Sequence, residues 1–118
     1  MTEKDEMIAL FDWASYRPDL QLMFHIPNEG RRSVQHTASL LRQGMKPGVP
    51  DILLPVAKGR YHGLFIELKR KYGGRTTPEQ KAWQAALLEE GYAVAVCKGF
   101  EEARETIDWY VRLKEGRR

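Results

Sequence analysis

The 118-residue sequence has one cysteine, Cys97, and no apolar run long enough to cross a membrane. A single cysteine excludes an intrachain disulfide and a thiolate-rich zinc site, and we expect Cys97 to be an inert thiol in a buried strand. A membrane helix needs about 20 consecutive apolar residues, and the charged residues 1–6 lack the apolar core of a signal peptide. The sequence therefore predicts a cytoplasmic protein of a reducing compartment.

A large charge excess is also absent. Lys and Arg number 19 against 16 Asp and Glu, and the sequence pI is about 9.1. This mild excess permits a polyanionic partner without requiring one. The three histidines are scattered without the spacing of metal ligands. Length and a 42% hydrophobic content predict one domain over 1–118, with a core at about 5–112 and a basic tail at 114–118.

The hydrophobic spacing predicts helices and strands in one interleaved order. Helices are expected over 5–16, 33–43 and 100–113, and another between the N-cap Thr77 and the C-cap Gly91. Strands are expected over 22–26, 51–56, 64–69 and 93–97, the last as a buried central strand because it is continuously apolar. This order predicts an α/β fold, a small mixed β-sheet flanked by α-helices.

Two carboxylates and a lysine stand out on the predicted hairpin. Glu67 and Lys69 share one face of their strand, because side chains two residues apart point the same way. Asp51 opens the preceding strand and is expected near them if the two strands pair. Charges on an apolar strand cost free energy unless they have a partner or a use. Asp51 and Glu67 supply the hard oxygen ligands that Mg²⁺ prefers, and Lys69 could orient or deprotonate an attacking water.

These residues resemble the PD-(D/E)xK nuclease superfamily. Pro50-Asp51 matches its first core motif and Glu67-Leu68-Lys69 its second. The sequence is most similar to one branch, the virus-type replication-repair nuclease (VRR-NUC) family. That similarity extends over residues 26–33, 46–51, 63–69 and 77–80.

The resemblance implies a restriction-endonuclease-like fold and metal-dependent cleavage of DNA. It implies Asp51, Glu67 and Lys69 as the catalytic trio, and the backbone carbonyl of Leu68 as a further metal ligand. Glu6 resembles an additional metal-binding glutamate on the first helix, and Gln80 a glutamine that assists the site. Mg²⁺ is the expected cofactor, and we expect Mn²⁺ to substitute for it.

The resemblance also implies a partner and a substrate. Stand-alone phage members resemble homodimers that act on Holliday junctions, so we expect a homodimeric endonuclease for branched DNA. Flanking polar and basic residues are expected to contact the DNA backbone. These residues are Asn28, Arg31, Arg32, Arg70, Lys71 and Arg75.

Each assignment has a simpler alternative. An aspartate after proline is commonly a turn residue, and the helix dipole alone favours Glu6 in a first turn. Gln80 fits a capping box with Thr77 equally well. The alternative functions are a flap or nicking nuclease, a structure-selective DNA-binding module with little turnover, and a purely structural dimer.

Overall fold

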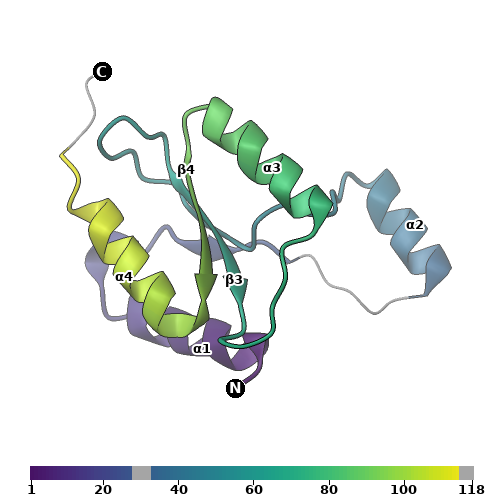
Figure 1. The fold of residues 1–118 in the computed structure, drawn as a ribbon, viewed down its shortest axis with the longest axis horizontal. Coiled ribbons are helices and arrows are strands. Elements are labelled where there is room, and N and C mark those ends of the chain that lie inside the picture. Colours follow the sequence, from purple (N-terminus) through teal and green to yellow (C-terminus); the bar gives the residue numbers. More distant parts are fainter. Residues whose placement is uncertain (28–32, 115–118) are drawn as a thin grey trace.

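The computed structural model describes residues 1–27 and 33–114. Figure 1 shows helices arranged around a small sheet. The elements follow the order predicted from the sequence, with one additional short 3-10 turn, η1. In chain order they are α1 (Glu3–Ala14), η1 (Pro18–Leu20), β1 (Phe24–His25), α2 (Val34–Arg42), β2 (Ile52–Leu54), β3 (Leu64–Lys69), α3 (Pro78–Glu89), β4 (Ala93–Lys98) and α4 (Gly99–Val111).

The four strands lie in the order β1-β2-β3-β4 and form a mixed sheet. β2 and β3 form the predicted antiparallel hairpin, in which Ile52 pairs with Ile66. β4 runs parallel to β3, with Leu68 opposite Cys97. The α/β class with a restriction-endonuclease-like fold is therefore confirmed.

The prediction that residues 93–97 form a central strand is wrong. Among the described residues, β4 lies at the edge of the sheet and pairs with β3 alone. Its apolar sequence has another cause, because both α3 and α4 contact it. An apolar run reports that the faces of a strand are covered, and it carries no information about whether both of its edges are paired.

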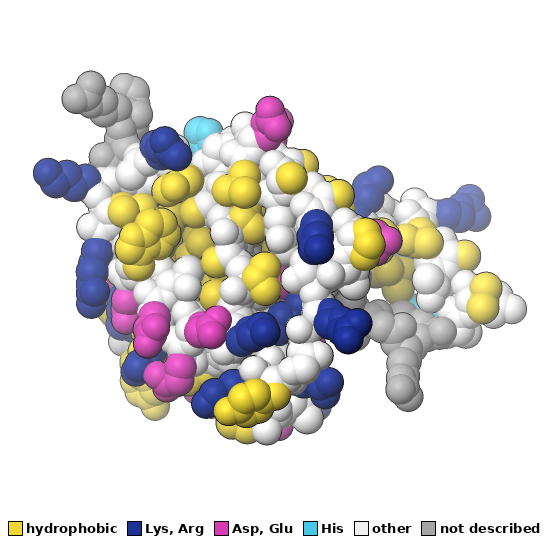
Figure 2. All heavy atoms as spheres, in the orientation of Figure 1, with side chains coloured by type: hydrophobic (Ala, Val, Ile, Leu, Met, Phe, Trp, Pro, Cys, Tyr) yellow, Lys and Arg dark blue, Asp and Glu magenta, His cyan; other side chains and the backbone are white. Residues whose placement is uncertain are grey.

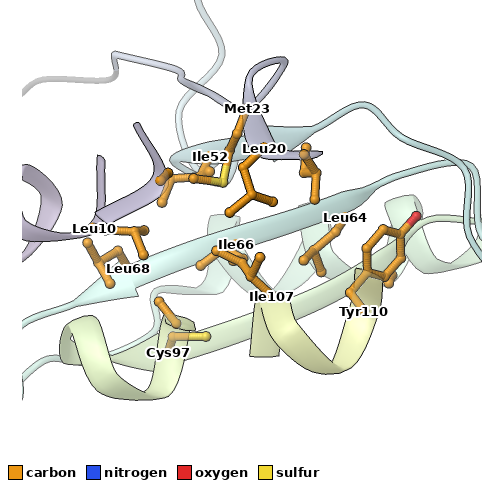
Figure 3. Close-up of a cluster of buried hydrophobic side chains, with 14 residues drawn as sticks. Leu10, Leu20, Met23, Ile52, Leu64, Ile66, Leu68, Cys97, Ile107 and Tyr110 are labelled. Carbon is orange, nitrogen blue, oxygen red and sulfur yellow. The ribbon is translucent and has the colours of Figure 1, made fainter. Parts of the chain in front are cut away.

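The hydrophobic core lies on one face of the sheet. Side chains alternate along a strand, so Leu64, Ile66 and Leu68 point together toward the face that α1 and α4 cover. Figure 3 shows Leu10 of α1 and Ile107 of α4 beside them, all fully or almost fully buried. The intervening residues of β3 must therefore point to the opposite face.

That opposite face carries the charged residues. Phe65, Glu67 and Lys69 alternate with the core residues along β3. The ring of Phe65 packs edge-on against Tyr92, with ring centroids 5.1 Å apart. Gln80, in the first turn of α3, forms hydrogen bonds to both Glu67 and Lys69. The sheet thus separates a dry core from a polar face under α3.

Several predicted boundaries shift for local reasons. α1 begins earlier than expected because Thr2 and Asp5 form a complete capping box. The strand expected over 22–26 shortens to the two residues of β1, and β2 ends at Leu54, before Pro55.

Within residues 1–27 and 33–114, none of the helices has the length and hydrophobicity that crossing a membrane requires.

Helix α2 is present as predicted but lies apart from the sheet and the other helices (Figure 1). None of its residues is buried, and Val34 is 83% exposed. Its N-cap Ser33 accepts a hydrogen bond from the backbone N–H of His36, which fixes the start of the helix. Local capping therefore defines this helix, and packing against the body does not.

Candidate active site

Asp51 is held through both its backbone and its side chain. Its carbonyl oxygen accepts a hydrogen bond from the backbone N–H of Ile26 (2.6 Å) and lies 2.9 Å from Nδ1 of His25. Its Oδ2 accepts a hydrogen bond from the backbone N–H of Leu68 at 2.8 Å. Asp51 therefore stands beside the end of β3, as the hairpin pairing predicts. The contact with His25 was not predicted, because nothing in the sequence pairs β1 with β2.

Glu67 and Lys69 are buried on the polar face, with exposures of 3% and 7%. Lys69 Nζ lies 3.6 Å from Glu67 Oε2. Burying two ionised groups is costly unless they are paired and hydrogen-bonded. The separation of 3.6 Å is too long for a strong hydrogen bond, so further partners are needed.

Gln80 provides those partners. Its Oε1 accepts hydrogen bonds from Lys69 Nζ (3.0 Å) and from the backbone N–H of Thr77 (2.9 Å). Its Nε2 donates to Glu67 Oε2 at 3.3 Å. Gln80 thus completes the capping box of α3 and bridges the charged pair. The capping interpretation is confirmed, and the part of Gln80 in catalysis stays a prediction.

The electrostatics around Glu67 favour its protonated form. Burial, followed by the nearby charge of Asp51, raises the pKa of Glu67 to about 8, although Lys69 acts in the opposite direction. Glu67 Oε1 is buried and has no hydrogen-bond partner among the described residues. An oxygen of this kind destabilises the protein unless something binds it.

A hard divalent cation fits this site. Asp51 and Glu67 are two adjacent carboxylates, one of which has a free buried oxygen. In the described part of the chain, no cluster of three or more His, Cys, Asp or Glu side chains is placed to bind a metal. Two carboxylates suit Mg²⁺, which binds few protein ligands and completes its shell with water and phosphate oxygens. They do not provide the closed ligand set of a structural zinc site.

Gly48 lies at a close contact between the loop before β2 and the first turn of α3. It has φ of +91°, a conformation that residues with a side chain rarely adopt. A Cβ at this position would lie only 2.7 Å from the backbone carbon of Glu79. The loop before β2 therefore packs directly on the first turn of α3, and this contact requires glycine for two independent reasons.

Glu6 is buried, with 6% exposure, and contacts the start of α4. Its Oε1 accepts a hydrogen bond from the backbone N–H of Phe100 at 2.9 Å. The N-cap residue of α4, Lys98, supplies no side-chain cap, so Glu6 takes that role from another helix. Lys98 is the register partner of Lys69, so Glu6 lies at the same end of the sheet as Glu67 and Lys69. It does not join a three-carboxylate group.

The predicted DNA-contacting residues fall into two groups. Asn28, Arg31 and Arg32 lie outside the described residues. The remaining three, all exposed, lie on the loop between β3 and α3, and Figure 2 shows Lys and Arg side chains gathered around this loop. They are Arg70, Lys71 and Arg75.

Comparison with known proteins agrees with this geometry. The VRR-NUC domain family model matches residues 1–101. A solved structure described as a VRR_NUC domain protein is 30% identical in sequence and superimposes with a TM-score of 0.88. The match covers 99% of this chain and 93% of that one. No curated protein sequence matches the chain significantly. The chain therefore belongs to the VRR-NUC family of restriction-endonuclease-like nucleases, which act on DNA.

Proposed function

We propose that the protein is a Mg²⁺-dependent endonuclease that hydrolyses phosphodiester bonds in branched DNA, with Mn²⁺ able to replace Mg²⁺. One observation carries this proposal. The carboxylates of Asp51 and Glu67 converge beside the buried amine of Lys69, and one Glu67 oxygen is buried without a partner. Such an arrangement costs free energy unless a cation and a phosphate bind to it.

Each residue has a distinct proposed role. Asp51 and Glu67 hold the cation, whose chemistry is to lower the pKa of a bound water and to stabilise the charge that develops on the phosphate. Lys69 orients the attacking water and offsets negative charge on the phosphate. Gln80 holds the side chains of Lys69 and Glu67 in position through its two hydrogen bonds. The products carry a 5′-phosphate and a 3′-hydroxyl.

The backbone carbonyl of Leu68 is the proposed third protein ligand. The N–H and C=O of one strand residue point toward the same neighbouring strand. The N–H of Leu68 points to Asp51 Oδ2, because β2 has no residue paired with this position. The carbonyl of Leu68 is therefore directed to the side on which Asp51 lies, where it can add an oxygen to the metal shell.

The proposed substrate is a four-way junction, and the proposed assembly is a homodimer. Resolving a junction takes two symmetric cuts, and a dimer with twofold symmetry supplies two active sites. Two groups of residues are proposed to contact phosphates, which position the DNA. They are Asn28, Arg31 and Arg32, and Arg70, Lys71 and Arg75.

The test is cleavage of labelled four-way junction, flap, nicked duplex and plain duplex DNA, with Mg²⁺, Mn²⁺ or a chelator. We expect paired symmetric cuts in the junction, none with the chelator, and nicks that ligase can seal because they carry a 5′-phosphate. Sedimentation at the protein concentration used for cleavage should show a dimer. The variant Asp51→Asn serves as the inactive control.

The alternatives give different results in the same assay. Cutting of flaps alone would keep the catalytic site but replace junction resolution by end processing. Tight junction binding without turnover in either metal would overturn the enzyme proposal and leave a DNA-binding module. A monomer that cuts only one strand would overturn the dimer.

Glu6 is proposed as a further residue of the metal site, and its structural role can be separated from that one. Its Oε1 is used by Phe100, and its Oε2 has no hydrogen bond among the described residues. Glu6→Gln keeps an oxygen that can accept from Phe100 but loses the charge. We therefore expect Glu6→Gln to melt close to the wild type and to cut at least tenfold more slowly at low Mg²⁺.

Glu6→Ala is the matched comparison, because it loses both functions. Removing a capping interaction costs about 0.5–2 kcal/mol, so a lower Tm is expected for this variant. If Glu6→Gln cuts like the wild type at every Mg²⁺ concentration, Glu6 acts only as the cap of α4.

A further inference from the structure

We infer that the loop between β3 and α3 forms, with the start of α1, a second phosphate-binding pocket beside the catalytic cluster. This inference rests on the proposed function and adds a subsite to it. The pocket is an open hollow of about 420 Å³. Its lining includes Glu3, Lys69, Arg70, Gly73, Gly74 and Arg75.

The pocket has an unbalanced positive charge. Lys69, Arg70 and Arg75 face one carboxylate, Glu3. Neither Arg70 nor Arg75 forms an ion pair with a residue in the described ranges 1–27 and 33–114. Arg17 is a contrasting case, since its guanidinium lies 2.9 Å from both Asp19 and Asp108. Two unpaired guanidinium groups at one hollow are available to an anionic ligand.

Two glycines bring the loop close to these cations. Gly73 has φ of +83°, and a Cβ there would lie 3.1 Å from the Arg70 Nη2. A Cβ at Gly74 would lie 2.9 Å from Cβ of Lys69, closer than real side chains approach. The loop can therefore approach Lys69 only because Gly74 lacks a side chain, and the positive φ of Gly73 favours glycine beside Arg70. This close fit favours a built pocket over a chance group of surface charges.

Lys71 lies on the same loop but outside the pocket. It follows Arg70 directly and is also exposed, but it does not line the hollow. Its Nζ lies 5.7 Å from the ring centroid of Tyr72. The three loop cations predicted as DNA contacts thus divide into two that line the pocket and one that does not. Lys71 is therefore a matched control of equal charge.

The chemistry of the pocket identifies the ligand as a phosphate of the DNA strand. Guanidinium groups bind phosphate oxygens through paired, charge-assisted hydrogen bonds. Lys69 lines this hollow and also contacts Glu67 and Gln80 in the catalytic cluster. The bound phosphate must therefore be a close neighbour of the one that is cleaved. It can be an internal phosphodiester or a 5′-terminal phosphate at a nick.

The experiment neutralises one DNA phosphate at a time. Junctions with a single methylphosphonate next to the cleavage position, on either side, are titrated with protein in Ca²⁺, which supports binding without rapid cutting. The proteins are the wild type, Arg70→Ala/Arg75→Ala and Lys71→Ala, each checked for an unchanged Tm. A parallel set of nicked substrates carries either a 5′-phosphate or a 5′-hydroxyl at the same position.

For the wild type we expect one neutralised phosphate to weaken binding about tenfold more than the others. In Arg70→Ala/Arg75→Ala, the same modification should have no further effect. The slope of log K against log salt should also fall by about 0.9 for that variant. Lys71→Ala should keep the wild-type sensitivity at that phosphate. Sensitivity at an internal phosphate assigns the pocket to a continuous strand, and sensitivity only to the 5′-phosphate assigns it to a strand end.

The pocket proposal is overturned if neutralising each neighbouring phosphate weakens binding equally for the wild type and the double variant. It is also overturned if binding by Lys71→Ala loses its sensitivity to the same phosphate. Cleavage of the unmodified junction by the wild type in Mg²⁺ is measured alongside. Normal cleavage with no sensitive phosphate would reject the pocket alone, whereas absence of cleavage would reject the proposed function.

Discussion

Replacing Lys69 by alanine is expected to lower the single-turnover rate of DNA cleavage by about 10²–10⁴-fold at saturating Mg²⁺. Lys69 is the buried cation beside both carboxylates, and its Nζ is held by Gln80 Oε1 at 3.0 Å. Its loss would remove the group proposed to orient the water and to offset phosphate charge. The loss of Lys69 also removes a cation that opposes the raised pKa of Glu67, so Glu67 should keep its proton to a higher pH.

The measurement must separate chemistry from folding and metal affinity. Rates are taken over a Mg²⁺ titration, and Tm is recorded for every protein. Lys69→Met keeps most of the stem that packs on Gly74 and should be as inactive as Lys69→Ala while melting closer to the wild type. Lys114→Ala, which changes an exposed lysine outside the proposed site, is the charge control and should cut within about threefold of the wild type. A folded Lys69→Met that cuts within tenfold of the wild type would show that Lys69 has no catalytic role.

Glu67→Gln is expected to destroy cleavage and, in the absence of metal, to stabilise the protein at alkaline pH. The pKa of Glu67 is raised from the ordinary value of 4.5 to about 8 in the folded protein. Between these values the folded state keeps a proton that the unfolded chain releases. Stability therefore falls as pH rises through this window and is fully reduced above about pH 8. Glutamine stays neutral, so the burial and the Asp51 charge that raise the pKa of Glu67 cost it no charged form.

The expected gain is roughly 1–3 kcal/mol at about pH 9, or a rise in Tm of roughly 5–15 °C, with almost no gain at about pH 4. Thermal unfolding in a chelator, measured for both proteins across this pH range, tests it. Added Mg²⁺ should raise the Tm of the wild type, because it binds the folded state, and leave the variant nearly unchanged. A gain that is equal at all pH values would show that Glu67 is not the titrating group.

The sequence was sufficient to predict the hairpin that carries the site. The alternation of Glu67 and Lys69 fixed their common face, and the pairing of the strands brought Asp51 to Leu68, where it accepts a hydrogen bond. The capping signals at Thr77 and Gln80 located α3 correctly. Each of these features depends on residues close together in the chain, so local rules suffice to predict them.

Features that depend on distant contacts could not be predicted in this way. The edge position of β4 follows from which strand it pairs with, and an apolar run does not encode that choice. The contact of Glu6 with Phe100 joins residues 94 positions apart. Likewise, the hydrophobic spacing of 33–43 predicted α2 correctly but did not predict its exposure. Spacing defines the apolar face of a helix but does not show whether another element packs on that face.

The link between Glu6 and Phe100 has a consequence for protein synthesis. A ribosome makes α1 before α4, at about 5–20 residues per second. Glu6 is therefore synthesised before every strand of the sheet and before Phe100, whose backbone N–H its carboxylate caps. Until then, Leu10 lacks the α4 side of its core, including Ile107. The hairpin and Gln80, which carry the proposed catalytic residues, are synthesised before α4. A nascent chain therefore has the side chains of the proposed site before it has a complete core to position them.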